Sequence, residues 1–318
     1  MRLTRLAIIL IIIIVILILS ASTFFIFLDS PKEFPVGSLY IVPTGSGLNL
    51  VSEDLNTKKI IRSPFWFKTF SVLVGGTKGI MAGDYALSHR ENTITLAYRL
   101  ARGDYNLEAV KVTIQEGLNV MDLAELLSSK FSKVDQKSFI DLAKSDEGYL
   151  FPDTYLFLPN VESSDIIKAL KSNFEKKITT LNAEITAFDK PLSDIIKMAS
   201  IVEREARTME SRQTVAGILW KRLEIGMPLQ VDVSFKYING KTTSGLTLDD
   251  LKIDSPYNSY LYKGLPPTPI ANPGLGAIKA TVTPTKTDYL YFLSDNKGKM
   301  HYAKTYQQHL QNKELYLR

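Results

Sequence analysis

The chain has 318 residues, of which 45% are hydrophobic and 22% charged, with 18 Gly and 14 Pro. This composition excludes disordered, collagen-like and coiled-coil proteins and is typical of a globular protein that carries an apolar segment. Because the chain contains no cysteine, disulfide frameworks, Cys-ligated metal sites and thiol nucleophiles are also excluded. The three histidines, His89, His301 and His309, form no H-E-x-x-H pair, so we expect neither a metal nor a cofactor.

Charge gives no argument for a nucleic-acid partner. Without Arg2 and Arg5, which precede the apolar segment, 36 of the 38 basic residues remain against 33 acidic ones. No basic block or RNP-like aromatic motif accompanies this small excess. We therefore expect no nucleic acid to bind.

The amino terminus carries an apolar run, Leu6 to Leu28, of 23 uncharged residues that are mostly Ile, Leu and Phe. A helix that rises about 1.5 Å per residue would cross a bilayer over this length. A cleaved signal peptide is the alternative, but its apolar core usually has only about 7–15 residues. We expect an uncleaved transmembrane helix over residues 6–28. By the positive-inside rule, residues 1–5 would then lie in the cytoplasm and the remainder outside.

Residues 36–130 predict a small α+β module. Its expected elements in chain order are a strand at 38–43, helices at 48–56, 64–74 and 93–101, a strand at 110–114 and a helix at 118–128. Asn92 can cap the third helix and Gly103 can end it. Residues 47–50 resemble residues 117–120, which is a weak sign of an internal repeat. No catalytic constellation falls here, so we expect this module to bind or position a ligand.

Residues 138–318 predict a second, mixed α+β domain. Its expected elements are helices at 138–143, 164–174, 192–207 and 211–225, a hairpin of strands at 289–294 and 300–303, and a terminal helix. Ser164 is the expected cap of the second helix, and Gly226 is expected to end the fourth. Between them and the hairpin lies a segment rich in Gly, Pro, Tyr and Asn, residues 240–276. Loops of that length inside a compact domain are usually functional.

Glu203 is the candidate acid of the helix 192–207. The packed face of this helix is formed by Ile195, Ala199, Val202 and Ala206. Glu203 lies at the edge of that face, where partial desolvation raises the pKa of a carboxyl and suits it to general acid catalysis. Glu205 lies about 200° further round the helix, so the two acids are not a paired-carboxylate site. The alternative is an exposed Glu203 that pairs with Arg207 on the next turn.

Four motifs carry a resemblance to a known family. Residues 199–205, Ala199-Ser200-Ile201-Val202-Glu203-Arg204-Glu205, resemble the signature helix A-S-I-V-E-x-E of the membrane-anchored, YceG-like endolytic murein (peptidoglycan) lytic transglycosylases. Three further stretches match that family in the same order, at residues 223–232, 255–260 and 264–274. Residues 287–292 and His301 also fit, so the resemblance runs from the apolar run nearly to the end of the chain.

The resemblance implies an α+β protein with three parts: the transmembrane helix 6–28, a LysM-like module over 36–130 and a catalytic transglycosylase domain over 138–318. The implied location is the bacterial cytoplasmic (inner) membrane, with one span, the amino terminus inside and the catalytic domain on the periplasmic or extracellular side. Peptidoglycan glycan strands are the implied substrate. Peptidoglycan synthases are expected partners from that location alone.

The resemblance also implies that Glu203 is the single catalytic acid/base, without metal or cofactor. It would protonate the glycosidic oxygen between N-acetylmuramic acid and N-acetylglucosamine within a nascent strand, as a carbon–oxygen lyase. Ordinary glycosidases use two carboxyls. A lytic transglycosylase needs one, because the C6 hydroxyl of the muramic acid attacks the anomeric carbon and gives a 1,6-anhydro end. Cutting strands in this way would terminate their elongation.

Further residues are expected around the sugar rings for their amides, carboxyl, hydroxyls and aromatic faces. They are Gln230, Asp232, Tyr257, Asn258 and Tyr260. The alternative for each is a residue of a turn or of the core. His301 is expected to make a structural hydrogen bond. Val233 and Ser259 replace the Pro and Thr that are usual in the family, which affects loop geometry and leaves the acid untouched.

Two other functions are compatible with parts of the pattern. The first is a non-catalytic, membrane-anchored scaffold that binds peptidoglycan, in which the Glu203 helix only packs. The second is a pyridoxal-phosphate lyase, but the sequence has no Gly-rich phosphate cradle for that cofactor.

Overall fold

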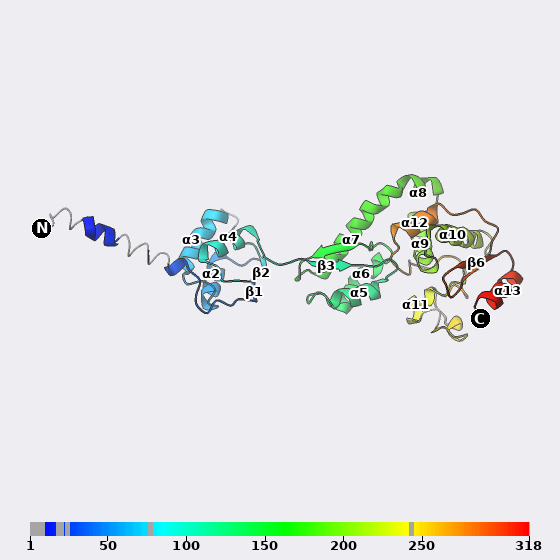
Figure 1. Ribbon diagram of the computed structural model, residues 1–318, viewed down its shortest axis with the longest axis horizontal. Coiled ribbons are helices and arrows are strands. Elements are labelled where there is room, and N and C mark those ends of the chain that lie inside the picture. Colours follow the sequence, from blue (N-terminus) through cyan, green and yellow to red (C-terminus); the bar gives the residue numbers. More distant parts are fainter. Residues whose placement is uncertain (1–9, 17–21, 23–25, 76–78, 242–244, 318) are drawn as a thin grey trace. The chain divides into compact units, whose positions relative to one another are not determined.

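The computed structural model describes residues 10–16, 22, 26–75, 79–241 and 245–317 (Figure 1). The chain divides into two compact units, Met1–Glu108 and Ala109–Arg318. Each unit combines helices with two-stranded antiparallel sheets, so the expected α+β class is confirmed. The division falls inside the range 36–130 that the sequence analysis expects for the first module.

The apolar run 6–28 lies in part outside the described residues. Residues 10–16 and 26–28 are helical. Within the part of the chain that the structure describes, no helix has the length and hydropathy that a membrane crossing requires.

The first unit is built on one antiparallel strand pair, β1 (Ser38–Val42) with β2 (Gly83–Leu87). Its helices are α2 (Leu48–Thr57), α3 (Pro64–Gly75) and α4 (Thr93–Arg102). Strand β1 alternates as a half-buried strand should, because Tyr40 and Val42 are buried whereas the residues beside them are exposed. As expected, Asn92 caps α4 by accepting the Thr95 N–H at 2.8 Å, and Gly103 ends it with a φ of 70°.

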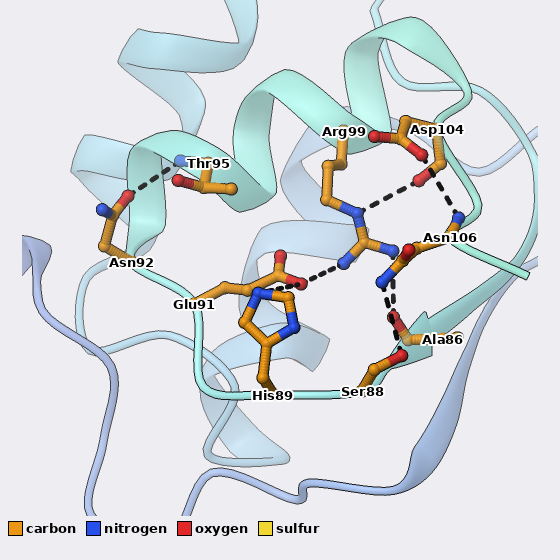
Figure 2. Close-up of polar contacts among 9 residues, drawn as sticks. All are labelled: Ala86, Ser88, His89, Glu91, Asn92, Thr95, Arg99, Asp104 and Asn106. Atoms are coloured by element: carbon orange, nitrogen blue, oxygen red, sulfur yellow. Dashed lines mark hydrogen bonds and ion pairs between the residues drawn. The ribbon is translucent and has the colours of Figure 1, made fainter.

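A buried ion pair holds the segment between β2 and α4 (Figure 2). Arg99 of α4 donates from Nη1 to Glu91 Oε1 at 2.5 Å and from Nη2 to the Ala86 carbonyl at 2.9 Å. Its Nε donates to the Asp104 carbonyl at 3.2 Å. The side chains of Arg99 and Glu91 are only 5% and 1% exposed, so each charge depends on the other for compensation.

The second unit begins with β3 (Val110–Thr113), which pairs antiparallel with β4 (Thr154–Phe157). Around this pair lie α5 (Val120–Ser128), α6 (Gln136–Ala143), the 3₁₀ turn η2 (Lys144–Asp146) and α7 (Ser163–Ile178). Leu123 of α5, Phe139 of α6 and Leu170 of α7 belong to one buried cluster. The strand and helix expected at 110–128 therefore pack with residues further along the chain. The cap expected at Ser164 is wrong, because α7 already begins at Ser163.

The remaining elements complete the second unit. They are η3 (Thr179–Leu181), α8 (Asn182–Phe188), α9 (Leu192–Glu205), α10 (Met209–Glu224), α11 (Ser234–Asn239), η5 (Asp250–Lys252), α12 (Leu275–Val282), the hairpin β5 (Tyr291–Ser294) with β6 (Met300–Ala303), and α13 (Tyr306–Tyr316). Helices α9, α10 and α12 all contact one another. The segment 240–276, expected to be one long loop, follows α11 directly, contains η5 and includes the first residues of α12. Gly226 follows α10 with a φ of 69°, as expected of a residue that ends a helix.

The side chain of Asn272 joins three segments of the second unit. Its Nδ2 donates to the Leu118 carbonyl at 3.0 Å and to Glu147 Oε1 at 3.1 Å. Its Oδ1 accepts the backbone N–H groups of Gly148 and Leu150, both at 2.9 Å. Asn272 is 1% exposed, and its bonds to Glu147, Gly148 and Leu150 are made away from water.

Backbone and carboxylate contacts extend this junction. The Asn272 N–H donates to the Leu118 carbonyl, and the Asn272 carbonyl accepts the Gly117 N–H, both at 2.9 Å. Glu147 accepts the Val120 N–H on its other oxygen at 2.9 Å. Burial raises the pKa of Glu147 to about 8. The turn after β3, the segment before β4 and the loop before α12 are therefore fixed to one another.

Replacing Arg99 by Met leaves the Glu91 carboxylate buried without its counter-ion. We expect the opening free energy of α4, measured by hydrogen exchange, to fall by roughly 3–5 kcal/mol, as when one partner of a buried pair is removed. Arg102→Met, at an exposed position of the same helix, is the control, and we expect a change within about 0.5 kcal/mol. Equal effects of the two substitutions would contradict the importance of the pair.

Asn272→Ala leaves three polar groups, Glu147 Oε1 and the N–H groups of Gly148 and Leu150, without their amide partner, whereas the Leu118 carbonyl keeps the backbone N–H of residue 272. Since each such group costs about 1–3 kcal/mol, we expect urea unfolding of the second unit to lose roughly 3–5 kcal/mol after partial relaxation. The control is Asn312→Ala, whose amide makes a single bond to the described part of the chain, at 3.4 Å to the Tyr302 carbonyl. An unchanged unfolding midpoint in Asn272→Ala would contradict this account of the junction.

Candidate active site

Glu203 lies in the last turn of α9, with a side chain that is only 4% exposed. Its Oε1 accepts a charged hydrogen bond from Arg212 Nη2, and its Oε2 accepts the backbone N–H of Gly274 at 2.9 Å. Burial raises the pKa of this carboxyl, whereas the Gly274 N–H and the Arg212 charge lower it. Burial is the largest of these effects, so the neutral acid is favoured relative to a carboxyl in water. The helical periodicity predicts this position at the edge of the buried face.

Arg212 is the cation that faces Glu203, in place of the Arg207 that the alternative interpretation requires. It lies in the first turn of α10, a helix begun by a reciprocal cap between Thr208 and Ser211. Its Nε donates to the Ala206 carbonyl at 3.1 Å, directly after α9. The guanidinium is thus held at the junction of α9 and α10, and its side chain is 13% exposed.

A second carboxyl, that of Glu116, lies beside the Glu203–Arg212 pair. Its Oε2 is 3.6 Å from Arg212 Nη2, and its side chain is 48% exposed. A Cβ on Gly274 would lie 1.8 Å from Glu116 Oε1, so the carboxyl rests against the glycine backbone and a side chain at position 274 would displace it. The charge of Glu116 raises the pKa of Glu203.

The turn that carries Glu116 is fixed from two directions. Arg204 Nη1 donates to the Gly117 carbonyl at 2.7 Å, and the Gly117 N–H donates to the Asn272 carbonyl at 2.9 Å. Gly117 has a φ of 81°, a conformation that glycine adopts without strain. Glu116 lies between the strand expected at 110–114 and the helix expected at 118–128, and nothing in the local sequence pattern connects it or Gly117 with α9.

Asp232 and Tyr260, two of the five expected substrate residues, lie together. The Tyr260 hydroxyl donates to Asp232 Oδ1 at 2.5 Å, and burial raises the pKa of that hydroxyl. Their neighbour is Glu205, whose pKa is raised to about 7, first by burial and then by the charge of Asp232. The charge of Arg222 acts in the opposite direction. Glu203 and Glu205 thus belong to separate clusters, as their angular separation on the helix predicts.

Tyr257 and Asn258 belong to the loop that follows η5. Asn258 is fully buried, and its Nδ2 donates to the Leu251 and Ile253 carbonyls at 3.0 and 2.9 Å. These contacts favour the turn-residue alternative for Asn258, since its amide already fixes the loop. Tyr257 is partly buried and shares a hydrogen bond of 2.8 Å with the Thr268 hydroxyl.

Gln230 is the most accessible of the five. Its side chain is exposed, its φ is 49°, and its backbone N–H donates to the Ser259 carbonyl at 3.1 Å. No hydrogen bond or ion pair between described residues joins any of the five to Glu203. His301 makes the structural contacts expected of it, because its Nε2 lies 2.9 Å from Asp295 Oδ2 and its ring stacks on Tyr316 at 3.6 Å.

A family profile and two curated proteins match this chain over most of its length. The profile of the YceG-like family matches residues 40–315. The endolytic murein transglycosylase of Bacillus subtilis strain 168 is 32% identical over 303 residues, which cover 87% of this chain and 84% of that protein. The protein of the same name from Streptococcus pneumoniae D39 is 28% identical over 326 residues, which cover 89% of this chain and 58% of that protein.

A solved structure is also similar. The crystal structure of a yceG-like protein from Listeria monocytogenes is 28% identical in sequence and has a TM-score of 0.59. The match covers 86% of this chain and 98% of that chain. With the family profile matching most of its length, this chain belongs to the YceG-like family.

Proposed function

We propose that this protein is an endolytic murein transglycosylase in which Glu203 is the single catalytic acid/base. The observation that carries the proposal is the carboxyl of Glu203, which is buried, raised in pKa and held by two donors at the end of α9. The relatives in Bacillus subtilis and Streptococcus pneumoniae bear the name of this activity. The proposed substrate is the β-1,4 bond between N-acetylmuramic acid and N-acetylglucosamine within peptidoglycan strands.

In the first step, neutral Glu203 donates its proton to the glycosidic oxygen while the bond from that oxygen to C1 of the muramic acid breaks. Burial raises the pKa of Glu203 above its ordinary value, which favours the protonated form that this step requires. The C6 hydroxyl of the same sugar then forms the new bond to C1 and gives its proton to the Glu203 carboxylate. The acid is regenerated, the product ends in 1,6-anhydro-muramic acid, and no water is consumed.

Arg212 and the Gly274 N–H serve the state between these two steps. After Glu203 has lost its proton, each of its oxygens accepts one hydrogen bond from a donor that the fold has already oriented. Charge-assisted bonds of this kind are stronger than neutral ones. The carboxylate is therefore kept in one orientation until it takes the proton of the C6 hydroxyl.

The surroundings of the substrate are part of the proposal. Gln230 is accessible for a sugar hydroxyl, and Asp232, Tyr257 and Tyr260 are partly buried groups that can line a subsite. Asn258 is assigned the supporting task of holding the loop.

The proposal includes a membrane anchor at residues 6–28, a location at the bacterial inner membrane and a LysM-like module that holds glycan before the catalytic part. Support for the anchor comes from the apolar run that follows Arg2 and Arg5. A site next to the membrane suits cleavage of nascent strands and would bring peptidoglycan synthases near as partners. The scaffold alternative shares this location and differs only in lacking cleavage.

Glu203→Gln tests the proposal, because the amide cannot donate a catalytic proton. Mass spectrometry of the products from uncrosslinked glycan should show internal fragments with 1,6-anhydro-muramic acid ends in the wild type. In the variant we expect cleavage to fall at least about 100-fold, the usual contribution of a general acid. Glu125→Gln, on an exposed position of α5, is the control and should cleave normally.

Three outcomes would contradict the proposal. Undiminished cleavage by Glu203→Gln would exclude Glu203 as the acid. Reducing ends in place of anhydro ends would indicate a hydrolase, and bound but intact glycan in the wild type would indicate the scaffold.

A further inference from the structure

The Arg212 guanidinium is shared by two carboxyls, and the mechanism above uses only one of them. Nη2 bonds Glu203 Oε1 and also lies 3.6 Å from Glu116 Oε2. Glu203 is buried, whereas Glu116 is half-exposed. The cluster thus consists of one buried carboxyl, one half-exposed carboxyl and one guanidinium that lies near both.

Two glycines at the start of α12, Gly274 and Gly276, leave room for the Glu116 carboxyl and the Arg212 guanidinium. Gly274 gives Glu116 its place, because a Cβ there would overlap the carboxyl. Gly276 does the same for the cation, since a Cβ at that position would lie 2.8 Å from Arg212 Nη1. Two glycines two residues apart therefore admit the two partners of one ion pair.

The charges of the cluster balance only when one proton is bound. Two carboxylates and one guanidinium carry a net charge of −1, and one proton on either carboxyl makes the set neutral. The groups that face Glu203 are Arg212 from α10, Glu116 from the turn after β3 and the Gly274 N–H from α12. On its own helix, Arg204 directs its guanidinium to the Gly117 carbonyl. Because Glu116 is solvated and Glu203 is not, the proton belongs on Glu203.

We propose that Glu116 is a positioning residue for the reaction: it serves as the alternative partner of Arg212, so that Glu203 can hold the proton that it donates. This inference rests on the proposed role of Glu203 as the acid. Without the charge of Glu116, Arg212 and the Glu203 carboxylate form a neutral pair, so Glu203 holds its proton less tightly. Burial still favours the protonated form, but the acid loses its proton at a lower pH than in the wild type.

Glu116→Gln tests the inference through a pH profile. Removing a negative charge lowers the pKa of Glu203, so the alkaline limb of kcat/KM, where the acid loses its proton, moves to lower pH. We expect the ratio of kcat/KM at pH 5.5 to that at pH 7.5 to rise at least about fivefold over the wild type. Glu116→Asp keeps the charge and should restore the wild-type limb in large part.

Gly274→Ala is a second variant that leaves Glu116 in the sequence. Its Cβ displaces the Glu116 carboxyl, while the N–H bound to Glu203 is retained and the φ of −77° suits alanine. The limb should move in the same direction as in Glu116→Gln. The double variant should move it no further, because both changes remove the same interaction.

Titration of the carboxyls by ¹³C NMR separates this inference from the proposed function. The Glu203 signal is identified by its absence in Glu203→Gln, and its midpoint should move to lower pH in Glu116→Gln whether or not glycan is cleaved. An unmoved midpoint, or a loss of activity that is equal at every pH, would overturn the role of Glu116. Cleavage retained by Glu203→Gln would instead overturn the proposed function.

Discussion

The second unit depends on one buried amide, that of Asn272, because it bonds both the turn after β3 and the segment before β4 to its own loop before α12. These segments come from distant parts of the chain: Asn272 and Leu118 are 154 residues apart in sequence. A buried polar group must be satisfied or it costs more than its bond is worth. Because the amide is stable in the interior only when all its hydrogen bonds are made, it fixes the relative positions of the segments that it contacts. Glu116 and Gly274 reach Glu203 from two of the segments that this amide joins.

The proposed acid is governed by a balance between solvation and hydrogen bonding. Burial favours the neutral carboxyl of Glu203, whereas Arg212 and the Gly274 N–H favour the carboxylate. Each form is needed once in the proposed cycle, so neither effect can dominate completely. The fold achieves this at the end of α9, where the Glu203 side chain is 4% exposed and two donors contact its carboxyl.

Local features of the sequence predict much of the fold. Asn92 and Gly103 predict the ends of α4, and the apolar period of α9 predicts the edge position of Glu203. Ser164 illustrates the limit, since a cap depends on where the chain enters the helix and not on residue type alone.

The partners of Glu203 could not be predicted in the same way. Arg212 is nine residues away on another helix, and the donor at Gly274 is a backbone N–H that no side-chain pattern reveals. Glu116 precedes Gly117 in a turn whose contact with α9 spans 87 residues of sequence. Asn272 lies within the stretch 264–274 that carries the family resemblance, but its type alone does not indicate which segments it joins.

The division between Glu108 and Ala109 has an evolutionary consequence. Every residue that contacts the Glu203 carboxyl in the described structure lies after the division, so the chemistry and the preceding unit are subject to separate selection. Duplication, exchange or enlargement of the amino-terminal part would leave the acid and its neighbours unaltered. The match covers 58% of the Streptococcus pneumoniae relative, so that protein has further residues outside the part that it shares with this chain. Changes confined to residues before the division thus leave the contacts of the Glu203 carboxyl in place.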